Sequence, residues 1–583
     1  MLAFKAFFTF GVHRCQTNPQ NALHAILMRR FPYREFLLMR TWRQSQNTHM
    51  WTYVGNCLRP LPTDSPHRFR FHVIAVVYDE EKARGERLYG MRTGFDNDMY
   101  IEMQAARIRE RIAQFGGKLY LEFGGKLFDD YHASRVLPGF EPDSKVRMLM
   151  SLADDAEVII AINANHIEGN KHRSDIGIAY SEDVLRLMDV YREMGLLVGG
   201  VVITHFTGQP HAEAYQRRLE AMNIKCYRHY IIDRYPSDID HIVSDEGFGK
   251  NDYVLTERPL VVVTAPGPGS GKLATCLSQL YHENKHGVTC GYAKFETFPV
   301  WNLPLKHPVN VAYEAATADL EDNNIIDPFH LEAYGSIAVN YNRDVETFPV
   351  LKAMMESILG ESPYQSPTDM GVNMVGNCIC DDEVCSNAAR NEVVRRYFHA
   401  REQLARTGVG KDEVAKLELL MQDVGVDVDL SPAHQAALSK AEASGLPAGA
   451  MVLPDGTLVT GKTSELLGAA SSLLLNALKV VAGIDDSTYI VSDAALEPIC
   501  HLKTEHMHSI NPRLHSDETL IALSISSATD PLAEKAIDAT EALRGCDAYF
   551  SVIISSTDEK TYAKLGINVC CEPVFERRAY YHR

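Results

Sequence analysis

The sequence lacks any long hydrophobic run, although it has 583 residues. No apolar stretch approaches the roughly 20 residues that a helix needs to cross a bilayer. The 12 cysteines are scattered without a regular framework, a pattern typical of reduced thiols in a cytoplasm rather than of disulfide bonds. We therefore expect a cytoplasmic protein that does not contact a membrane.

The sequence also has too few basic residues to balance its acidic ones, and it lacks a common hydrolase motif. Each of these absences excludes a class of function. The formal net charge is −18, so the phosphate backbone of a nucleic acid would be repelled. The motif G-x-S-x-G does not occur, so the sequence does not support a serine hydrolase. The expected partner is a small-molecule substrate, with no nucleic acid.

The first 90 residues differ from the rest in charge. They hold 13 Lys and Arg against 6 Asp and Glu, a net charge of +7, which leaves −25 on residues 91–583. They show no sustained helical or strand periodicity. Glu86-Arg87 can be encoded by a purine-rich ribosome-binding sequence, and three codons then separate it from Met91. We expect residues 1–90 to be a mis-annotated leader or a disordered extension, with Met91 as the true start.

From Met91 onward, strand-like and helix-like patterns alternate. The β-branched runs 158–163 and 197–204 are too continuous for one-sided strands and are typical of buried parallel strands. Alternation at this spacing predicts a parallel sheet covered by helices on both faces. The expected strands are 118–123, 158–163, 197–204, 225–230, 260–264 and 288–295, and the expected helices are 96–115, 181–194, 211–222 and 272–283.

The second half of the sequence is less regular. Residues 296–345 are rich in Pro, Asn and Asp and predict a long structured loop, which is usually functional. Residues 349–359 and 382–420 are helical in pattern, and the Ala- and Ser-rich segment 431–449 could link them to a last unit. That unit is expected to contain a hairpin at 454–456, helices at 465–481 and 531–543, and strands at 519–525 and 548–555.

These patterns predict a multidomain α/β protein. At roughly 100–200 residues per domain, the chain is long enough for several cores. We expect a parallel-sheet core that is Rossmann-like or P-loop-like, a helical middle region and a smaller C-terminal α/β domain. The expected domains are residues 91–255, an N-terminal α/β domain; 256–360, a glycine-loop segment that completes the core; 361–447, mainly helical; and 448–583, the C-terminal α/β domain.

A glycine-rich loop lies between a strand that ends at Thr264 and a helix that starts at Lys272. Glycines allow positive φ angles and leave no side chain between backbone amides and phosphate oxygens. The helix N-terminus adds its positive dipole, and the lysine supplies a mobile cation. The loop therefore predicts a site for ATP, another nucleotide or a phosphorylated small molecule, held by Gly267, Gly269, Ser270, Gly271 and Lys272.

The loop departs at two positions from the strict pattern G-x-x-x-x-G-K-[ST]. Pro266 stands at the first glycine, and Leu273 replaces the hydroxyl residue that usually binds Mg²⁺. Thr275 cannot replace it, because it lies about 200° around the helix. Residues 268–272 still resemble the loop of adenylate-kinase-like nucleotide kinases, in which the metal is held largely through water. A role for Mg²⁺ stays open, and the alternative is a glycine-rich turn without a ligand.

A second segment, residues 456–463, satisfies the strict pattern letter for letter. The residues between its two glycines are bulky or β-branched, which favours a strand after the Asp455-Gly456 turn. We interpret this match as a chance one. Thr463 and Ser464 would cap the next helix, where Lys462 could still attract an anion.

Three residues beyond the loop are candidates for catalysis. Glu296 ends a strand at the edge where open α/β sheets bind ligands, and it could orient metal-bound water or accept a proton. Arg343 and Asp344 follow a short strand, and a guanidinium there would suit the charge on a transferring phosphoryl group. The alternatives are a solvated strand end for Glu296 and a surface ion pair of Arg343 with Asp344.

Three cysteines, Cys378, Cys380 and Cys385, lie close together in the sequence. Their spacing is not that of a zinc ribbon. Cys385 lies in a helical stretch and is expected in the core, whereas Cys378 follows a Gly-Asn turn and is the better candidate for a reactive thiol. Cys378 supports an alternative function, a Cys- or metal-dependent hydrolase.

Five long motifs resemble those of the bacterial domain-of-unknown-function family 1846. They are residues 114–126, 244–252, 264–272, 327–335 and 366–373. The resemblance runs from about Met91 to the C-terminus, and members of the family begin near that position. It implies a cytoplasmic, multidomain α/β protein that forms a homo-oligomer, and it implies no activity.

The loop and the catalytic candidates together predict an ATP- or nucleotide-dependent enzyme that transfers a phosphoryl group to a small molecule or ligates it. Two alternatives stay open. One is the hydrolase centred on Cys378. The other is a non-catalytic sensor whose loop binds a phosphorylated metabolite and shifts domain packing.

Overall fold

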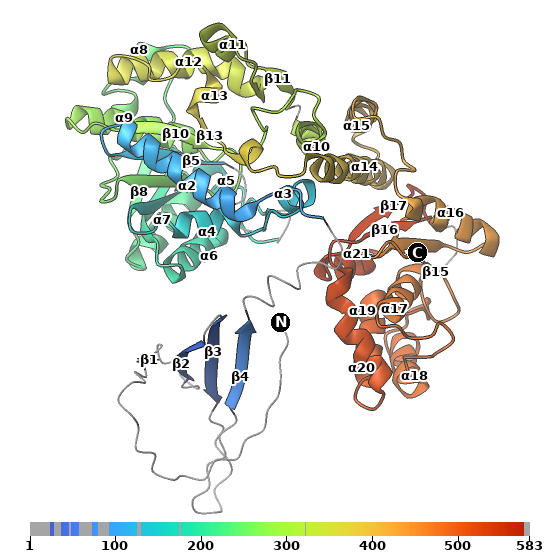
Figure 1. The fold of residues 1–583 in the computed structure, drawn as a ribbon. Helices are drawn as coiled ribbons and strands as arrows, with labels where there is room; N and C mark the ends of the chain where they lie inside the picture. Colours follow the sequence, from blue (N-terminus) through green and yellow to red (C-terminus); the bar gives the residue numbers. More distant parts are fainter. Residues whose placement is uncertain are drawn as a thin grey trace, which may run out of the picture. The chain divides into compact units, whose positions relative to one another are not determined.

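The computed structural model of the chain describes residues 92–124, 127, 130–173, 177–320 and 322–576, and the backbone of four strands within residues 1–91 (Figure 1). The chain divides into two units, Met1–Met91 and Arg92–Arg583, and each is described by itself.

The first unit contains a four-stranded antiparallel sheet with the order β1-β2-β3-β4. The sequence shows no periodicity that predicts these strands. Apart from these four strands, residues 1–90 lie outside the described part of the chain. The prediction that they are a leader or a disordered extension therefore stays a prediction. The strands are β1 (His24–Leu27), β2 (Phe36–Ser45), β3 (Thr48–Cys57) and β4 (Val73–Asp79).

A seven-stranded parallel sheet forms the centre of the second unit, which confirms the predicted parallel α/β fold. The order is β13-β10-β5-β9-β6-β7-β8. Every residue of β6 and β9 is buried, because both faces of the sheet are covered. The strands are β5 (Leu119–Phe123), β6 (Ala156–Asn163), β7 (Leu197–Phe206), β8 (Cys226–Tyr230), β9 (Leu260–Thr264), β10 (Gly291–Phe295) and β13 (Gly371–Val372).

Helices cover the two faces of this sheet (Figure 1). The chain runs from β6 to β8 in one direction across the sheet, and from β9 to β10 in the other. Because crossover connections are right-handed, the helices of the two runs lie on opposite faces. One face carries α2 (Asn97–Gln114), α4 (Ser144–Met150), α6 (Tyr180–Glu193) and α7 (Pro210–Ala221), and the other carries α8 (Ile239–Ile242), α9 (Lys272–Lys285) and α12 (Asn342–Leu359).

Local sequence signals set the ends of these helices. At the start of α2, the carboxylate of Asp96 accepts a hydrogen bond from the amide of Met99 at 2.9 Å. After its end, Gly116 adopts a φ of 69°. Pro210 occupies the first turn of α7, where its missing amide proton costs nothing. The four helices predicted in this part of the sequence are therefore confirmed, with bounds that differ by at most two residues.

The segment between β10 and α12 contains more structure than the predicted loop. Its elements are α10 (Pro308–Ala316), η2 (Ala318–Leu320), β11 (Asn324–Ile326), α11 (Pro328–Tyr334) and β12 (Val339–Tyr341). The prediction that α12 starts at Pro349 is wrong, because the helix begins at Asn342 and the proline lies inside it. Proline is favoured in a first turn, so the pattern misplaced the start.

The helical region between the two sheets differs from the prediction at its end. The expected link over residues 431–449 is mostly a helix, because Ser431 caps it and Pro432 occupies its first turn. The helices here are α13 (Pro367–Met370), η3 (Val375–Asn377), α14 (Asp382–Thr407), α15 (Lys411–Asp423) and α16 (Pro432–Ser444).

A smaller mixed sheet with the order β15-β14-β16-β17 forms the C-terminal part. The strand predicted at 519–525 is wrong. This segment is a helix that starts with a capping box of His515 and Glu518. The elements are β14 (Ala448–Val452), β15 (Leu458–Lys462), α17 (Ala469–Val481), α18 (Asp493–His501), η4 (Leu502–His506), α19 (Ser516–Ser526), α20 (Pro531–Asp538), η5 (Ala539–Leu543), β16 (Asp547–Phe550), α21 (Ser556–Lys564) and β17 (Asn568–Cys571).

One buried carboxylate, Glu392 of α14, joins separate parts of the second unit. It accepts a hydrogen bond from Arg135 of α3 (Tyr131–Val136) at 2.9 Å. It also pairs with Arg395 of its own helix at 2.8 Å, and Arg395 reaches the carboxylate of Asp547 in β16 at 2.8 Å. Burial opposes the charge, but these guanidinium groups hold the pKa of Glu392 well below its ordinary value.

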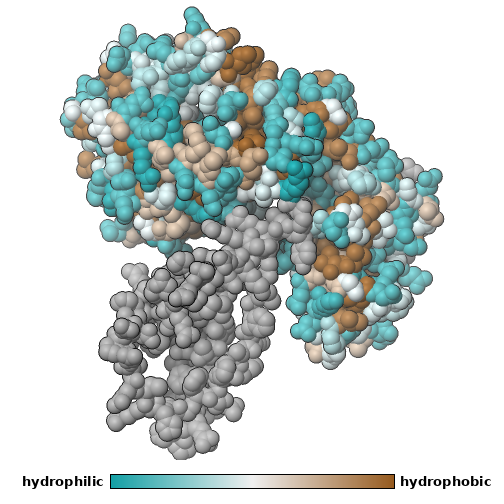
Figure 2. All heavy atoms as spheres, in the orientation of Figure 1, coloured by the Kyte–Doolittle hydropathy of each residue, from teal (hydrophilic) through white to brown (hydrophobic). Residues whose placement is uncertain are grey.

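The face of the described residues that Figure 2 shows is mostly polar, with local patches of apolar side chains. The segment from η2 to β12 carries several exposed apolar side chains, which are Leu320, Ile326, Leu331, Tyr334 and Ile337. Within the described part of the chain, no helix combines the length and the apolar character that a membrane span requires.

Candidate functional site

The predicted glycine loop joins the C-terminal end of β9 to the N-terminal end of α9. Gly269 and Gly271 have φ angles of 71° and 79°, in the left-handed region that favours glycine. Gly271 is the residue before the helix and offers no side chain to cap it. The local backbone therefore requires glycine at these two positions, as the sequence predicts.

The carbonyl groups of the loop are bonded within the protein. The amide of Asn163, at the end of β6, donates to the carbonyl of Gly269 at 3.0 Å. The hydroxyl of Thr204, in β7, donates to the carbonyl of Ser270 at 2.8 Å. Ser270 itself donates to the carbonyl of Gly267 at 2.7 Å. Neighbouring strands thus fix the loop through its acceptors.

The amide groups of the loop differ from its carbonyl groups. Within the described part of the chain, the amides of Gly267 and of residues 269–274 have no hydrogen-bond acceptor. Unpaired backbone amides in a loop and in the first turn of a helix form a site of positive potential. An anion such as a phosphate group would satisfy them.

The walls of the loop leave no room for a side chain at its first glycine. A Cβ atom at Gly267 would lie 2.2 Å from the phenol oxygen of Tyr180, the first residue of α6. A Cβ atom at Gly271 would lie 3.0 Å from three atoms of Thr204. The contact at Gly267 explains why the loop carries glycine where the strict pattern allows other residues, and the contact at Gly271 fits the glycine that the pattern requires.

Two histidines beside the loop were missed by sequence reasoning. His166, in α5 (Ala164–Glu168), lies 3.6 Å from the position of a Cβ atom at Gly269, and His205 follows Thr204 in β7. Burial lowers the pKa of both, and nearby Lys171 lowers that of His166 further. Both imidazoles are therefore neutral at neutral pH. Their signal in the sequence is their position close to the ends of buried strands, His205 in the last two residues of β7 and His166 three residues after β6.

The loop lies where the order of the sheet reverses. The chain leaves β6 toward β7 and leaves β9 toward β10, so the connections diverge between the neighbouring strands β6 and β9. In open α/β sheets, ligands bind at this point beyond the carboxyl ends of the strands. The position of the loop fits that rule.

A charged cluster lies at the same edge of the sheet, beyond β10. Lys294 pairs with Glu296 at 2.9 Å and also with Asp344, at the start of α12. On the neighbouring strand, Glu122 accepts a hydrogen bond from Tyr292 at 2.9 Å. The structure therefore brings together the predicted residues Glu296 and Asp344, and it adds Lys294 and Glu122.

The surroundings shift the pKa values of this cluster. Burial raises the pKa of Glu296, Lys294 opposes that rise, and the nearby carboxylate of Asp344 adds to it. Burial disfavours the charge on Lys294, but the carboxylates of Glu296 and Asp344 raise its pKa overall. A carboxyl group whose pKa is raised toward neutrality can hold or release a proton, as general acid–base catalysis requires.

Arg343 does not join this cluster. Its guanidinium group pairs with the buried carboxylate of Asp322 at 2.9 Å and is 62% exposed. The surface pair with Asp344 considered from the sequence is replaced by a pair with Asp322. The proposed contact of Arg343 with a phosphoryl group stays a prediction.

Cys378 lies in the core directly after η3. Its thiol is fully buried and faces the carbonyl of Met374 at 3.3 Å. Burial raises its pKa to about 12, so the thiol stays protonated at neutral pH. Cys385 is also buried, as predicted. These observations weigh against Cys378 as a nucleophile.

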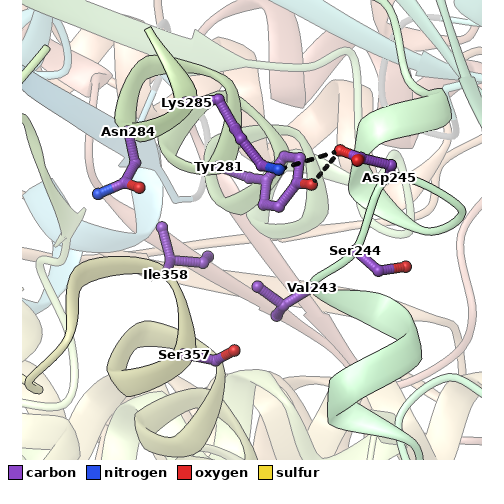
Figure 3. Close-up of a pocket in the computed structure, with 8 residues that line it drawn as sticks. All are labelled: Val243, Ser244, Asp245, Tyr281, Asn284, Lys285, Ser357 and Ile358. Carbon is purple, nitrogen blue, oxygen red and sulfur yellow. Dashed lines mark hydrogen bonds and ion pairs between the residues drawn. The ribbon is translucent and has the colours of Figure 1, made fainter. Parts of the chain in front are cut away.

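A surface hollow of about 310 Å³ lies near the opposite end of α9 (Figure 3). Asp245 accepts a hydrogen bond from Tyr281 at 2.6 Å and pairs with Lys285 at 3.2 Å on its rim. The charged groups of this hollow are thus paired with each other. It is separate from the loop, which lies at the N-terminal end of the same helix.

The second segment that fits the glycine–lysine pattern folds as a hairpin, as predicted. Gly456 forms the turn with a φ of 85°, and residues from Leu458 onward form β15, paired with β14. The prediction that Thr463 and Ser464 cap the next helix is wrong, because α17 begins at Ala469. Residues 463–468 form an irregular loop in which Leu467 forms an isolated bridge with Leu514.

Comparison with known proteins adds the family. The model of the N-terminal domain of unknown function DUF1846 matches residues 93–425, and the C-terminal DUF1846 model matches residues 429–581. The chain belongs to the DUF1846 family.

Relatives in the DUF1846 family match over nearly their whole length. A UPF0371 protein of Corynebacterium diphtheriae is 56% identical, over 84% of this chain and 99% of the relative. A UPF0371 protein of Corynebacterium efficiens is 55% identical, over 85% of this chain and 100% of the relative. A UPF0371 protein of Streptococcus thermophilus is 53% identical, over 84% of this chain and 100% of the relative.

Two of the DUF1846 motifs named above are bonded to each other. Asp327, which is fully buried, caps α11 through the amides of Phe329 and His330, both at 3.0 Å. Its second carboxylate oxygen accepts a hydrogen bond from the hydroxyl of Thr368 at 2.7 Å. These motifs thus fix the segment that leads into α12 and Asp344.

Proposed function

We propose that this protein binds a nucleotide such as ATP, or a related phosphorylated small molecule, at the loop of residues 264–272. One observation carries the proposal: side chains of Asn163, Thr204 and Ser270 hold the carbonyls of the loop, whereas its amides have no acceptor among the described residues. A backbone fixed by its acceptors, with unpaired donors at a helix N-terminus, is suited to an anion.

The chemistry we propose is phosphoryl transfer or ligation on a small molecule. Lys272 would contact the outer phosphates, and Glu296 with Asp344 would handle a proton at the same edge of the sheet. If Mg²⁺ accompanies the nucleotide, we expect it to be bound through water, because Leu273 offers no oxygen ligand. Arg343 would have to leave Asp322 in order to contact a phosphoryl group.

Titration calorimetry with ATP tests the proposal. We expect Lys272→Ala to weaken ATP binding by roughly tenfold to hundredfold, since charge-assisted hydrogen bonds contribute about 1.5–3 kcal/mol. Lys462→Ala, in the hairpin that carries the same pattern, is the matched control and should bind like the wild type. Equal affinity of the wild type and Lys272→Ala for ATP would contradict the assignment.

A sensor without catalysis is the second candidate. It is favoured by the pairing of the acidic cluster with Lys294, which leaves Glu296 and Asp344 engaged in the free protein. Incubation with ATP and pools of small metabolites separates the two candidates, because an enzyme would convert ATP to a nucleoside diphosphate or monophosphate. A homo-oligomer stays a proposal, which sedimentation analysis would test.

A further inference from the structure

A second lysine, Lys171, lies beside the glycine loop. Its side chain is exposed, and its ammonium group contacts Nε2 of His166 at 3.4 Å and the face of the Tyr180 ring, whose centroid lies 5.2 Å away. Among the described residues, neither Lys171 nor Lys272 forms an ion pair with a carboxylate. An ammonium group can donate several hydrogen bonds, so Lys171 keeps donors for a ligand.

The two side chains that contact Lys171 are also walls of the loop. The ring of Tyr180 fills the space beside Gly267, where a Cβ atom would lie 2.2 Å from the phenol oxygen. Nε2 of His166 lies 3.8 Å from the position of a Cβ atom at Gly269. The two rings meet edge to face, with their centroids 5.3 Å apart. The charge of Lys171 therefore lies next to the part of the loop where the amides of Gly267 and Gly269 have no acceptor among the described residues.

The backbone holds Lys171 in this place from two sides. Its amide donates to the carbonyl of His166, in α5, at 2.9 Å, and its carbonyl accepts the amide of Tyr180, the first residue of α6, at 2.8 Å. His172 forms an isolated bridge with Ala179. A cation on a fixed backbone loses less conformational entropy when it binds a ligand than one on a free segment does.

The hydrogen bond to Lys171 also defines the protonation of His166. An ammonium group only donates, so Nε2 accepts, and the proton of the neutral ring is on Nδ1. Burial lowers the pKa of His166, and the charge of Lys171 lowers it further. The imidazole is therefore neutral at neutral pH and remains an acceptor that positions the ammonium group.

Lys171 and Lys272 belong to elements on opposite faces of the sheet. Lys171 lies just before α6, which covers one face, and Lys272 begins α9, which covers the other (Figure 1). A single phosphate monoester carries a charge of about −1.5 to −2 at neutral pH, which the loop amides and Lys272 already complement. A further cation on the other side of the loop complements a second phosphate group.

We propose that Lys171 binds a second phosphate group, so that the site takes a ligand with a chain of two or more phosphates in preference to a monophosphate. One phosphate group lies on the loop amides beside Lys272, and the next lies at Lys171, which His166 and the ring of Tyr180 position. The inference rests on the proposed function for the loop itself, and it narrows the ligand to diphosphates, triphosphates and inorganic polyphosphates.

Titration calorimetry with ATP, AMP, tripolyphosphate and inorganic phosphate provides the first test. We expect Lys171→Ala to weaken the binding of ATP and tripolyphosphate roughly tenfold or more, and to leave the affinities for AMP and inorganic phosphate unchanged. Lys171→Arg should restore most of the lost affinity, because it restores the charge. Lys462→Ala, which removes an exposed lysine from the hairpin, is the matched control and should bind all four like the wild type.

Two results of this titration would contradict the inference. One is equal affinity of the wild type and Lys171→Ala for ATP and tripolyphosphate. The other is equal affinity of the wild type for ATP and AMP. Because Lys171 is exposed, we expect the Tm of the free variant to stay that of the wild type, so a loss of affinity is not a loss of fold.

The imidazole of His166 provides an independent readout by NMR. A polyphosphate at Lys171 adds negative charge beside the ring, so the pKa of His166 should rise when tripolyphosphate binds. In Lys171→Ala the pKa of His166 in the free protein should rise as well, because the neighbouring positive charge is lost. A pKa of His166 that saturating tripolyphosphate leaves unchanged would place the anion elsewhere and overturn the inference.

The same measurements separate this inference from the proposed function. Binding of tripolyphosphate that Lys171→Ala weakens, without any binding of ATP, would refute the nucleotide and support the inference. Binding of ATP that Lys272→Ala weakens and Lys171→Ala does not would support the loop and refute the inference. Binding of none of the four compounds would refute both.

Discussion

Two glycine–lysine segments of this chain can be compared directly. Residues 456–463 fit the strict phosphate-loop pattern and fold as the second strand of a hairpin. The loop that ends at Lys272 departs from the pattern and joins a buried parallel strand to a helix. The residues between the glycines account for the difference, because Leu458 and Val459 favour an extended backbone whereas proline and glycine prevent one.

The comparison shows that glycine serves a different purpose in each segment. Gly271 supplies a left-handed backbone beside Thr204, where a side chain has little room. Gly461 lies in a strand and lets α17 approach the sheet, since a Cβ atom there would lie 2.3 Å from the amide nitrogen of Leu473. A pattern of letters cannot separate these roles, but the backbone angle and the neighbouring atoms do.

Among changes in the loop, the largest effect should come from Gly271→Ala. The positive φ of 79° and the contact with Thr204 at 3.0 Å add strain and overpacking, together about 2–4 kcal/mol in the free energy of unfolding. Gly456 has a φ of 85°, but a Cβ atom there would meet open space. Gly456→Ala should therefore lower the free energy of unfolding by only about 1–2 kcal/mol. Urea unfolding of both variants checks the difference. Equal losses would show that the loop relaxes around the added methyl group.

Gly461→Ala should destabilise the C-terminal part by about 3 kcal/mol or more, because the added Cβ atom would lie 2.3 Å from the backbone nitrogen of Leu473 and α17 must move away from β15. ATP binding should be unaffected in this variant. Hydrogen exchange of α17, followed together with calorimetry, measures both quantities. A loss of ATP binding with an intact fold would assign the hairpin a role in the site.

Thr204→Val should have a smaller effect on stability, about 1 kcal/mol, because one buried carbonyl of the loop loses its donor. We expect the affinity for ATP to fall more than the stability does, since a mobile loop presents its amides poorly. Thr275→Val is the control. The hydroxyl of Thr275 donates to the carbonyl of Gly271, but this carbonyl also accepts a hydrogen bond from the backbone amide of Thr275, so it keeps a donor in the variant. Unchanged ATP binding in Thr204→Val would show that this hydrogen bond does not position the loop.

The smallest effect is a pH dependence of stability, which should have opposite signs beside the loop and around His434 and His515. Burial lowers the pKa of His166 and His205 beside the loop, so the folded state there loses stability as the pH falls below the ordinary value near 6.5. Burial opposes protonation of His434, but Glu572 and Asp429 raise its pKa, and Asp558 raises that of His515. The stabilisation that these two histidines provide is fully present below about pH 6.5, and it is lost as the pH rises through their pKa values in the folded state.

Hydrogen exchange at about pH 5.5 and about pH 7.5 checks this prediction, because histidines titrate between these values. After correction for the intrinsic exchange rate, protection of α5 and β7 should decrease at the lower pH. Protection of α16 and α19 should increase. The same sign of change in both regions would contradict the assigned pKa shifts.

The sequence predicts the central sheet well because its strands are buried on both faces and read as continuous apolar runs. It fails for α19, where Ile521 and Ile525 are exposed although they look like core residues. The helix carries apolar side chains on both sides, so periodicity does not separate it from a strand. Only the capping box at its start indicates a helix.

The site itself is predicted in part. The loop and the residues Glu296 and Asp344 are found because each lies near a strand or glycine signal. The partners Lys294, Glu122 and His166 are missed, because their proximity depends on which strands are neighbours. Strand order across a sheet is a long-range property that no local pattern contains.

The carboxylate of Glu392 has a consequence for any attempt to divide the chain. A chain that ends at residue 425, where the first family model stops, would keep Arg395 and lose Asp547. It would also lose Tyr549, whose ring packs at 5.5 Å on Phe398 of α14. The shortened molecule would expose an apolar helix face next to a guanidinium group with half of its counter-charge, so we expect it to aggregate rather than to fold alone.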